Sequence, residues 1–317
     1  MGVLSGVLVV DERENIAPGF KQDLKTRLEA GDYQITCGLV SNPKGKLIVL
    51  PSADSTASAA GPVTGNDLIG PEVEYRVKTA RIVSEMGPML SILKDAVAKG
   101  DLESAKLAFE KVRSSFLQAA PLWPQSGDSA SALVADLPEI GAKLYDGQPT
   151  PGLEGILTRT TTEAEEFRIA SRAAIPEASA LLKEAVLIAR HLFDGAAEEA
   201  TPQNAGCQNS ILLNYLLDDR SGPQTAVVAD LVDGIERVTA RFLPLVGKVR
   251  PAAAANVTSA IARFRVQLAA ASDHSRRFNS DLTASQLDGL RAAAADVASS
   301  VAQMTIVLGL EAKEAKQ

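Results

Sequence analysis

The sequence predicts a mainly α-helical protein, an antiparallel helical bundle preceded by part of a β-sandwich. Two observations favour this class. Only 4% of the residues are aromatic while 46% are hydrophobic, and alanine is abundant, which is typical of packed helices rather than of a large sandwich. The spacing of apolar residues also changes along the chain, from alternate positions near the start to a 3.6-residue period after Pro71.

The N-terminal region is expected to form three or four strands. Alternating and β-branched residues mark the ranges 3–10, 20–28, 33–37 and 46–50. Turn-forming residues, mainly glycine, proline and asparagine, separate these ranges. So few strands cannot close a sandwich, and we therefore expect unpaired edges with local instability, or association through that face.

The composition indicates three parts of the chain. The β region is predicted at 1–52 and a linker rich in alanine, serine and glycine at 53–70. The helical domain is predicted at 71–317.

The helical region opens with two predicted helices. Apolar residues on one face of each are Ile82, Met86, Met89, Leu93 and Val97, then Ala105, Ala108, Phe109, Val112 and Phe116. Gly100 should end the first helix, and Asp101 should cap the second. Five prolines between 121 and 160 predict only short helices there.

Four longer apolar stripes follow. They run through 176–193, 227–245, 257–268 and 287–308, and Thr283 is expected to cap the last helix. Each helix must bury one face, so these stripes indicate core rather than a ligand surface. Together they predict an antiparallel bundle.

Charge and motifs exclude several function classes. A net charge of −7 argues against a nucleic-acid-binding surface. The chain has no run of eighteen apolar residues, so we expect no membrane span. It also has no glycine-rich phosphate loop and no His-Glu-x-x-His motif. We therefore expect that it is not a zinc peptidase and that it is non-enzymatic. Cys37 and Cys207 form no Cys-x-x-Cys pair, and a disulfide between them stays open.

Several runs carry a family resemblance. The segments 4–20, 33–38 and 42–49 resemble the second half of the cupredoxin-like domain in the EfeO family, the periplasmic components of EfeUOB ferrous-iron uptake systems. Beyond the linker, 100–106 before 112–116, and 278–283 before 307–310, more weakly resemble the imelysin-like helical domain of the same family.

The resemblance implies a role, partners and a location. It implies capture of iron, with copper as the alternative metal, outside the inner membrane. Partners would be an EfeU-like permease and an EfeB-like haem peroxidase, with this protein periplasmic and peripheral to the membrane. The first residues lack the features of a secretory signal. Because the first half of the β-domain is missing, we expect that Met1 is not the natural beginning.

Cys37 is the sharpest metal-ligand candidate. A thiolate near a turn, with Asp11, Glu12 and Glu14 on a neighbouring loop, could bind iron or copper through mixed sulfur and oxygen ligands. The alternatives are a small buried cysteine at a strand end and a solvated acidic turn. A blue-copper site is disfavoured because neither histidine nor methionine lies between Cys37 and Lys46.

In the bundle the family's His-x-x-Glu metal motif is absent. The resemblance places Glu154 where the histidine would stand and Leu157 where the glutamate would stand, and Ala120 replaces another family glutamate. Glu184 is the carboxylate that would remain. The sequence therefore predicts a weak bundle site at best, and its alternative function is a degenerate paralogue that serves as a protein-interaction module of the cell envelope.

The two histidines have ordinary explanations. His191 lies near the end of the predicted helix 176–193, where it would interact with the helix dipole, and His274 lies in a polar turn.

Overall fold

The computed structural model describes residues 2–5, 8–12, 28, 31–36, 44–50, 63–145, 152–193, 224–272 and 283–310. They belong to two compact units, an N-terminal unit that ends at Val63 and a helical unit that begins at Thr64.

The N-terminal unit contains one antiparallel sheet of four strands. The strands are β1 (Gly2–Ser5), β2 (Leu8–Glu12), β3 (Gly31–Thr36) and β4 (Gly45–Val49), in the order β2-β1-β3-β4. β3 pairs with β1 through Gly2 opposite Thr36 and with β4 through Tyr33 opposite Leu47. A single small sheet fits many β folds, so the cupredoxin-like half-domain continues to rest on the sequence resemblance.

The sheet corrects one predicted strand. The range 3–10 was expected to be continuous, but it contributes to both β1 and β2, because Ser5 pairs with Leu8 and the chain reverses between them. The predicted strand 20–28 lies outside the described residues, apart from Leu28.

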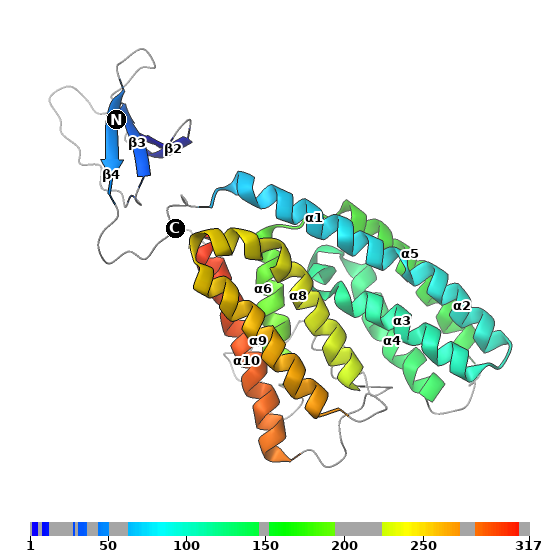
Figure 1. Cartoon of the computed structure of the whole chain (residues 1–317). Helices are drawn as coiled ribbons and strands as arrows, with labels where there is room; N and C mark the ends of the chain where they lie inside the picture. The colour runs from blue at the N-terminus through cyan, green and yellow to red at the C-terminus, as the bar shows by residue number, and fades with distance from the viewer. Residues whose placement is uncertain are drawn as a thin grey trace, which may run out of the picture. The chain divides into compact units, whose positions relative to one another are not determined.

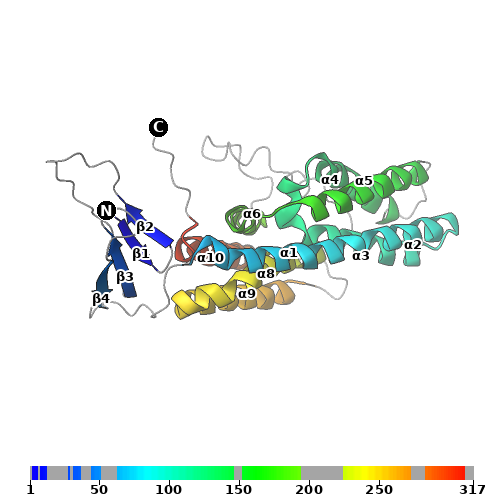
Figure 2. The same cartoon turned by 90° about the horizontal axis from the view of Figure 1, so that it is seen from above.

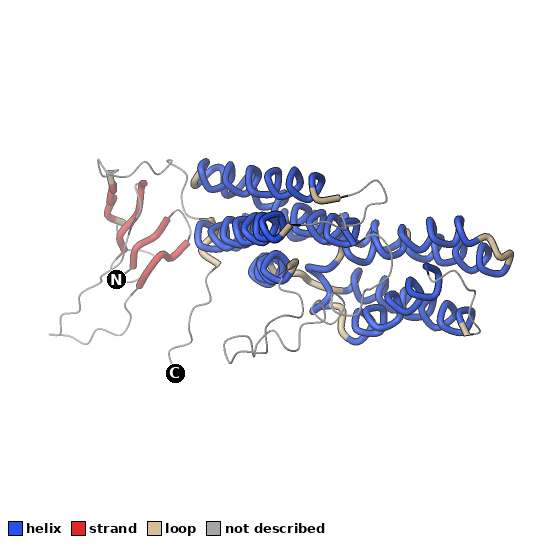
Figure 3. The backbone as a smooth tube through the Cα atoms, turned by 90° about the horizontal axis from the view of Figure 1, so that it is seen from below, coloured by secondary structure: helices blue, strands red, loops and turns tan. Residues whose placement is uncertain are grey.

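Nearly all of the described helical unit is α-helix (Figures 1 and 3). Its elements are α1 (Gly65–Ser84), α2 (Met86–Ala98), α3 (Leu102–Gln118), the 3₁₀ helix η1 (Ala120–Gln125), α4 (Asp128–Tyr145), α5 (Leu153–Ala173), α6 (Ala178–His191), α8 (Gln224–Val249), α9 (Pro251–Ala270) and α10 (Ala284–Val307). The helical bundle is as predicted. The predicted first helix, however, is two helices, α1 and α2, which meet at Glu85, so Ile82 lies on α1 and Met86 on α2.

Local sequence signals explain several helix ends. Thr64 and Asp67 form a capping box at the start of α1, which therefore begins six positions before the predicted Pro71. Gly100 has φ +70°, a conformation that glycine adopts without strain, and it ends the turn after α2. Asp101 caps α3 by accepting a hydrogen bond from the Ser104 amide at 3.1 Å, as expected.

The proline-rich section forms longer helices than expected. α4 has 18 residues and runs through Pro138, and α5 has 21. Proline removes one backbone donor. Leu133, Leu137 and Ile140 are nevertheless fully buried on α4, and burial of this face outweighs the local cost of the proline.

The helices form two packed groups. In one group α2 and α4 each pack against both α3 and α5, while in the other α10 packs against both α6 and α9. α1 contacts α5, α3 and α2, and η1 contacts α6, α3 and α5. Seen from above, α4 and α5 lie on one side of α1, while α9 lies on the other (Figure 2). None of the described helices is long and apolar enough to cross a membrane.

An aromatic cluster lies among α3, η1 and α5. The Phe116 and Trp123 rings stack with centroids 4.3 Å apart, and Phe167 of α5 packs edge-on against Phe116 at 5.4 Å. The Trp123 indole donates to the Phe116 carbonyl at 3.1 Å. This cluster ties η1 to α3 and α5.

Candidate functional site

A pair of carboxylates lies between α4 and α5. Asp136 of α4 is only 4% exposed, although it is charged. Arg159 of α5 donates to both of its carboxylate oxygens, with Nε at 2.9 Å from Oδ2. The Thr160 hydroxyl lies 2.9 Å from Asp136 Oδ2 and 2.9 Å from the Ile156 carbonyl, so it can donate to one of them at a time. Three donor groups thus surround this buried carboxylate.

Glu163, one turn after Arg159 on α5, is the second member of the acid pair. Its Oε1 lies 3.6 Å from Arg159 Nε, and its side chain is 15% exposed. Its Oε2 is buried and has no hydrogen-bond partner in the described part of the chain. Burial, with the neighbouring charge of Asp136 next, raises the pKa of Glu163 to about 7, while Arg159 opposes the shift.

The acid pair offers hard oxygen atoms, the kind of ligand that suits iron, magnesium or manganese. Arg159 already supplies a positive charge there, so a metal cation would have to displace its guanidinium, whose side chain is 55% exposed. Within the described ranges, no group of three or more His, Cys, Asp or Glu side chains is arranged to hold a metal ion. The acid pair is therefore a two-carboxylate site that a cation and a proton would compete for.

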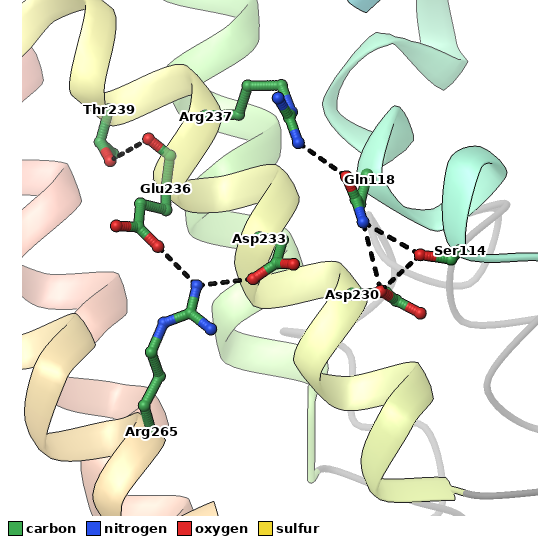
Figure 4. Close-up of polar contacts among 8 residues, drawn as sticks. All are labelled: Ser114, Gln118, Asp230, Asp233, Glu236, Arg237, Thr239 and Arg265. Carbon is green, nitrogen blue, oxygen red and sulfur yellow. Dashed lines mark hydrogen bonds and ion pairs between the residues drawn. The ribbon is translucent and has the colours of Figure 1, made fainter. Parts of the chain in front are cut away.

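A second buried carboxylate lies between α3 and α8 (Figure 4). Asp230 Oδ1 accepts from the Ser114 hydroxyl at 2.7 Å and from Gln118 Nε2 at 3.3 Å. Gln118 Nε2 also donates to Ser114 Oγ at 3.0 Å, and its Oε1 accepts from Arg237 at 2.6 Å. Burial raises the pKa of Asp230, and the two hydrogen bonds from Ser114 and Gln118 oppose that shift. We call these four side chains the Asp230 network.

Close packing of α8 against the end of α3 positions this network. A Cβ added at Gly234 would lie 3.1 Å from the Gln118 carbonyl oxygen and 3.4 Å from that of Leu117. Glycine thus permits the approach that brings Asp230, one turn earlier on α8, within reach of Ser114. On the other side of α8, Arg265 of α9 bonds Asp233 at 2.6 Å and also Glu236 (Figure 4).

A hollow of about 650 Å³ opens beside the Asp230 network. Its lining includes Glu85 between α1 and α2, Glu110 and Lys111 of α3, and Asp230. Glu110 accepts a hydrogen bond from the Tyr145 hydroxyl. The hollow is therefore lined by several carboxylates, some of them hydrogen-bonded to neighbouring side chains, and by a lysine. This combination fits no single class of ligand.

The two predicted bundle ligands lie on separate helices. Glu154 is exposed in the first turn of α5, where an acid favours the helix N-terminus. Glu184 is half-buried on α6, and burial raises its pKa. Neither belongs to a group of three potential ligands among the described residues. Ala120 is buried at the start of η1, and Leu157 is buried on α5.

The N-terminal candidates lie largely outside what is described. The backbone of Asp11 and Glu12 belongs to β2, and their side chains are not described. Cys37 and Glu14 fall outside the described residues, as do Cys207 and His274. His191 is the last residue of α6, the position predicted for it.

Sequence reasoning missed Asp136 and Glu163. A signal for Asp136 was present, because it interrupts the buried stripe formed by Leu133, Leu137 and Ile140. An acid at such a position requires a compensating partner. Nothing in the sequence indicated that Arg159 and Glu163, 23 and 27 positions later, would meet it.

Comparison with known proteins gives a family context. No family model matches the chain. It is 37% identical over 169 residues to the iron uptake system component EfeO of Yersinia pestis, which covers 52% of the chain. It is 38% identical over 120 residues to EfeO of Escherichia coli K12. Over these stretches the chain is EfeO-like. The EfeO-like stretch covers 44% of the Yersinia protein and 32% of the Escherichia protein, so the chain matches less than half the length of these curated relatives.

Proposed function

We propose that this chain is the iron-binding component of an EfeUOB-type uptake system. It would capture iron outside the inner membrane, in the periplasm, and pass it to an EfeU-like permease, with an EfeB-like haem peroxidase as the third component. The observation that carries this proposal is the 37–38% identity to proteins named as iron uptake system components.

The N-terminal unit is the proposed place of metal binding. Cys37 would supply a thiolate, and Asp11, Glu12 and Glu14 would supply carboxylates, a mixed set that accepts iron or copper without strong selectivity. This assignment rests on the resemblance of 33–38 and of the acidic run to the family's metal-binding β-domain.

The bundle would add a weaker cation site at the acid pair. Asp136 and Glu163 provide oxygen ligands, and a cation would replace both the Arg159 guanidinium and the proton that Glu163 retains near neutral pH. Glu154 and Glu184 would play at most an accessory part, since each lies apart from any three-ligand group among the described residues.

The second candidate function is a degenerate paralogue whose helical domain serves as a protein-interaction module. One observation favours it for the bundle: the acid pair is already neutralised by an arginine of the same chain, at 2.9 Å. A guanidinium bonded to Asp136 compensates the buried carboxylate without a metal ion.

Calorimetric titration with ferrous iron under anoxic conditions, and then with copper, tests both proposals on the full chain. Cys37→Ala should abolish the tighter binding, while Cys207→Ala serves as the matched control and should leave it intact. The double variant Asp136→Asn/Glu163→Gln should remove only a weaker second phase.

The alternative outcomes are distinct. If the unchanged chain binds neither metal, the iron-uptake role is wrong and the interaction module is favoured. If Cys37→Ala binds as the unchanged chain does and the double variant does not, iron is held by the bundle.

A further inference from the structure

Three arginines gather around one groove on the surface of the helical unit. Arg76 and Arg81 of α1 and Arg172 of α5 line a hollow of about 500 Å³. Val77 and Ala80 also line it. None of these arginines forms an ion pair with another residue in the described ranges. This positive cluster stands out in a chain whose net charge is −7.

Three carboxylates of α1 and α5 bond other partners. Glu74 pairs with Lys78 at 2.8 Å and with Arg241 of α8. Glu72 accepts the Ala178 backbone amide at 2.7 Å. On α5, Glu165 pairs with Arg168. Like charges held close together repel, so an external anionic group would relieve the repulsion among the three groove arginines.

An exposed apolar stripe continues from this groove along α1. Ile69, Val73 and Val77 are 55%, 45% and 60% exposed. They are spaced four residues apart, so they lie on one face of the helix and extend over about 12 Å. Ile175, just after α5, is 82% exposed, and the Ala178–Glu72 hydrogen bond brings this connection beside α1. Exposed aliphatic side chains next to a charged groove are typical of an interaction surface.

We propose that the groove between α1 and α5 docks an acidic amphipathic helix of a protein partner. The carboxylates of that helix would bind Arg76, Arg81 and Arg172, whose guanidinium forks match carboxylates in bidentate geometry. Its apolar face would cover the stripe of Ile69, Val73 and Val77, in the way amphipathic helices fill grooves. Charge complementarity together with the adjoining stripe selects this occupant.

Other occupants fit these observations less well. A small multivalent anion would use the arginines but leave the aliphatic stripe exposed. A concave groove presents less surface to a flat anionic bilayer than to a helix. This inference is independent of the iron-uptake proposal.

Fluorescence anisotropy with a labelled helical peptide of about 18 residues tests the proposal. The probe carries glutamate on one flank and leucine at i, i+3, i+4 and i+7, and a matched peptide carries glutamine in place of glutamate. The full chain should bind the acidic peptide at least tenfold more tightly than the glutamine peptide. The triple variant Arg76→Gln/Arg81→Gln/Arg172→Gln should lose at least tenfold in affinity, and Val73→Ser/Val77→Ser should lose severalfold.

The matched control is Arg190→Gln/Arg250→Gln/Arg263→Gln, which removes the same charge elsewhere and should bind as the unchanged chain does. An equal loss of peptide affinity in both triple variants would show a general charge effect and would contradict binding in the groove. Equal binding of the two peptides would overturn carboxylate recognition. If millimolar citrate displaces the acidic peptide and the Val73→Ser/Val77→Ser variant binds that peptide as the unchanged chain does, the groove binds a small anion instead. If the chain binds phosphatidylglycerol vesicles through these arginines but does not bind the peptide, the groove binds a membrane instead.

Discussion

The acid pair between α4 and α5 and the Asp230 network between α3 and α8 compensate buried carboxylates in different ways. Asp136 is balanced by a full charge, the Arg159 guanidinium, and shares its site with a second acid, Glu163. Asp230 bonds the neutral donors of Ser114 and Gln118. At the first site a guanidinium bonds the carboxylate directly. At the second only the neutral groups of Ser114 and Gln118 bond it, while Arg237 bonds Gln118.

Because of this difference, we expect the two sites to respond to different changes, one to pH and the other to helix spacing. A site that contains two acids and an arginine changes its protonation near neutral pH and can exchange its cation. A site of neutral donors depends instead on the distance between the helices that carry them. Each site has one carboxylate whose pKa is raised, Glu163 in the first and Asp230 in the second. The two sites therefore differ in the groups that bond the carboxylates, not in the presence of a raised pKa.

Replacing the two aspartates by alanine should give the largest contrast. Asp136→Ala should lower the free energy of unfolding by about 2–3 kcal/mol, because it leaves a buried gap and removes the acceptor shared by Arg159 and Thr160. Asp230→Ala should cost about 1–2 kcal/mol, since Ser114 and Gln118 still bond each other. Urea unfolding at neutral pH measures both. Equal costs would remove the distinction between the two sites.

The pH dependence of stability should distinguish the acid pair further. Below about pH 4.5 Glu163 is protonated in the folded and the unfolded chain. Between that value and about 7 only the unfolded chain releases the proton, so stability falls as pH rises, and above about 7 the loss is complete. Glu163→Gln should therefore be more stable than the unchanged chain at about pH 8, by roughly 1–2 kcal/mol after allowance for screening, and similar at about pH 4.

Glu165→Gln is the matched control for this experiment. The Glu165 carboxylate is exposed, and its hydrogen bond with Arg168 lowers its pKa, so this variant should gain no stability at the higher pH. Thermal unfolding across the pH range compares the two variants. A pH-independent difference between Glu163→Gln and the unchanged chain would contradict a raised pKa at Glu163.

A methyl group at the α3–α8 contact should have the smallest effect and test the geometric character of the Asp230 network. In Gly234→Ala the new Cβ would meet the Gln118 carbonyl oxygen at 3.1 Å, so the helices must separate slightly. The overpacking loss exceeds the gain in helix propensity, for a net cost of about 1 kcal/mol or less. Gly155→Ala on α5 meets nothing within 4 Å and should stabilise the chain instead. Equal gains in both variants would show that α8 does not need the close approach.

The helices were predictable because each one buries a periodic face. Val227, Leu231, Ile235, Val238 and Phe242 of α8 are buried as their spacing predicted. Thr283 caps α10 through a capping box with Gln286, also as predicted. The predicted helix break at Pro138 was wrong, because burial of one face of α4 outweighs the local cost of the proline. The single predicted strand 3–10 was also wrong, because it forms parts of the two paired strands β1 and β2.

The candidate site was predictable only in part. The sequence singled out carboxylates and a cysteine from family resemblance, and in the described bundle those acids, Glu154 and Glu184, stand apart from any three-ligand group. The acids that do meet, Asp136 and Glu163, have no shared motif. Pairing between residues on two helices depends on how the helices are rotated about their axes, which hydrophobic spacing alone does not specify residue by residue.

By itself the sequence determined the mainly helical class, the positions of most buried faces and caps, and the EfeO resemblance, because periodicity, capping and homology are recorded in neighbouring residues. The tertiary structure decided which polar side chains share a buried space. It brought Arg159 and Glu163 to Asp136, Ser114 to Asp230, and Arg172 to Arg76 and Arg81. Contacts between residues far apart in the chain form only when whole helices pack, and burial then changes their charge and protonation.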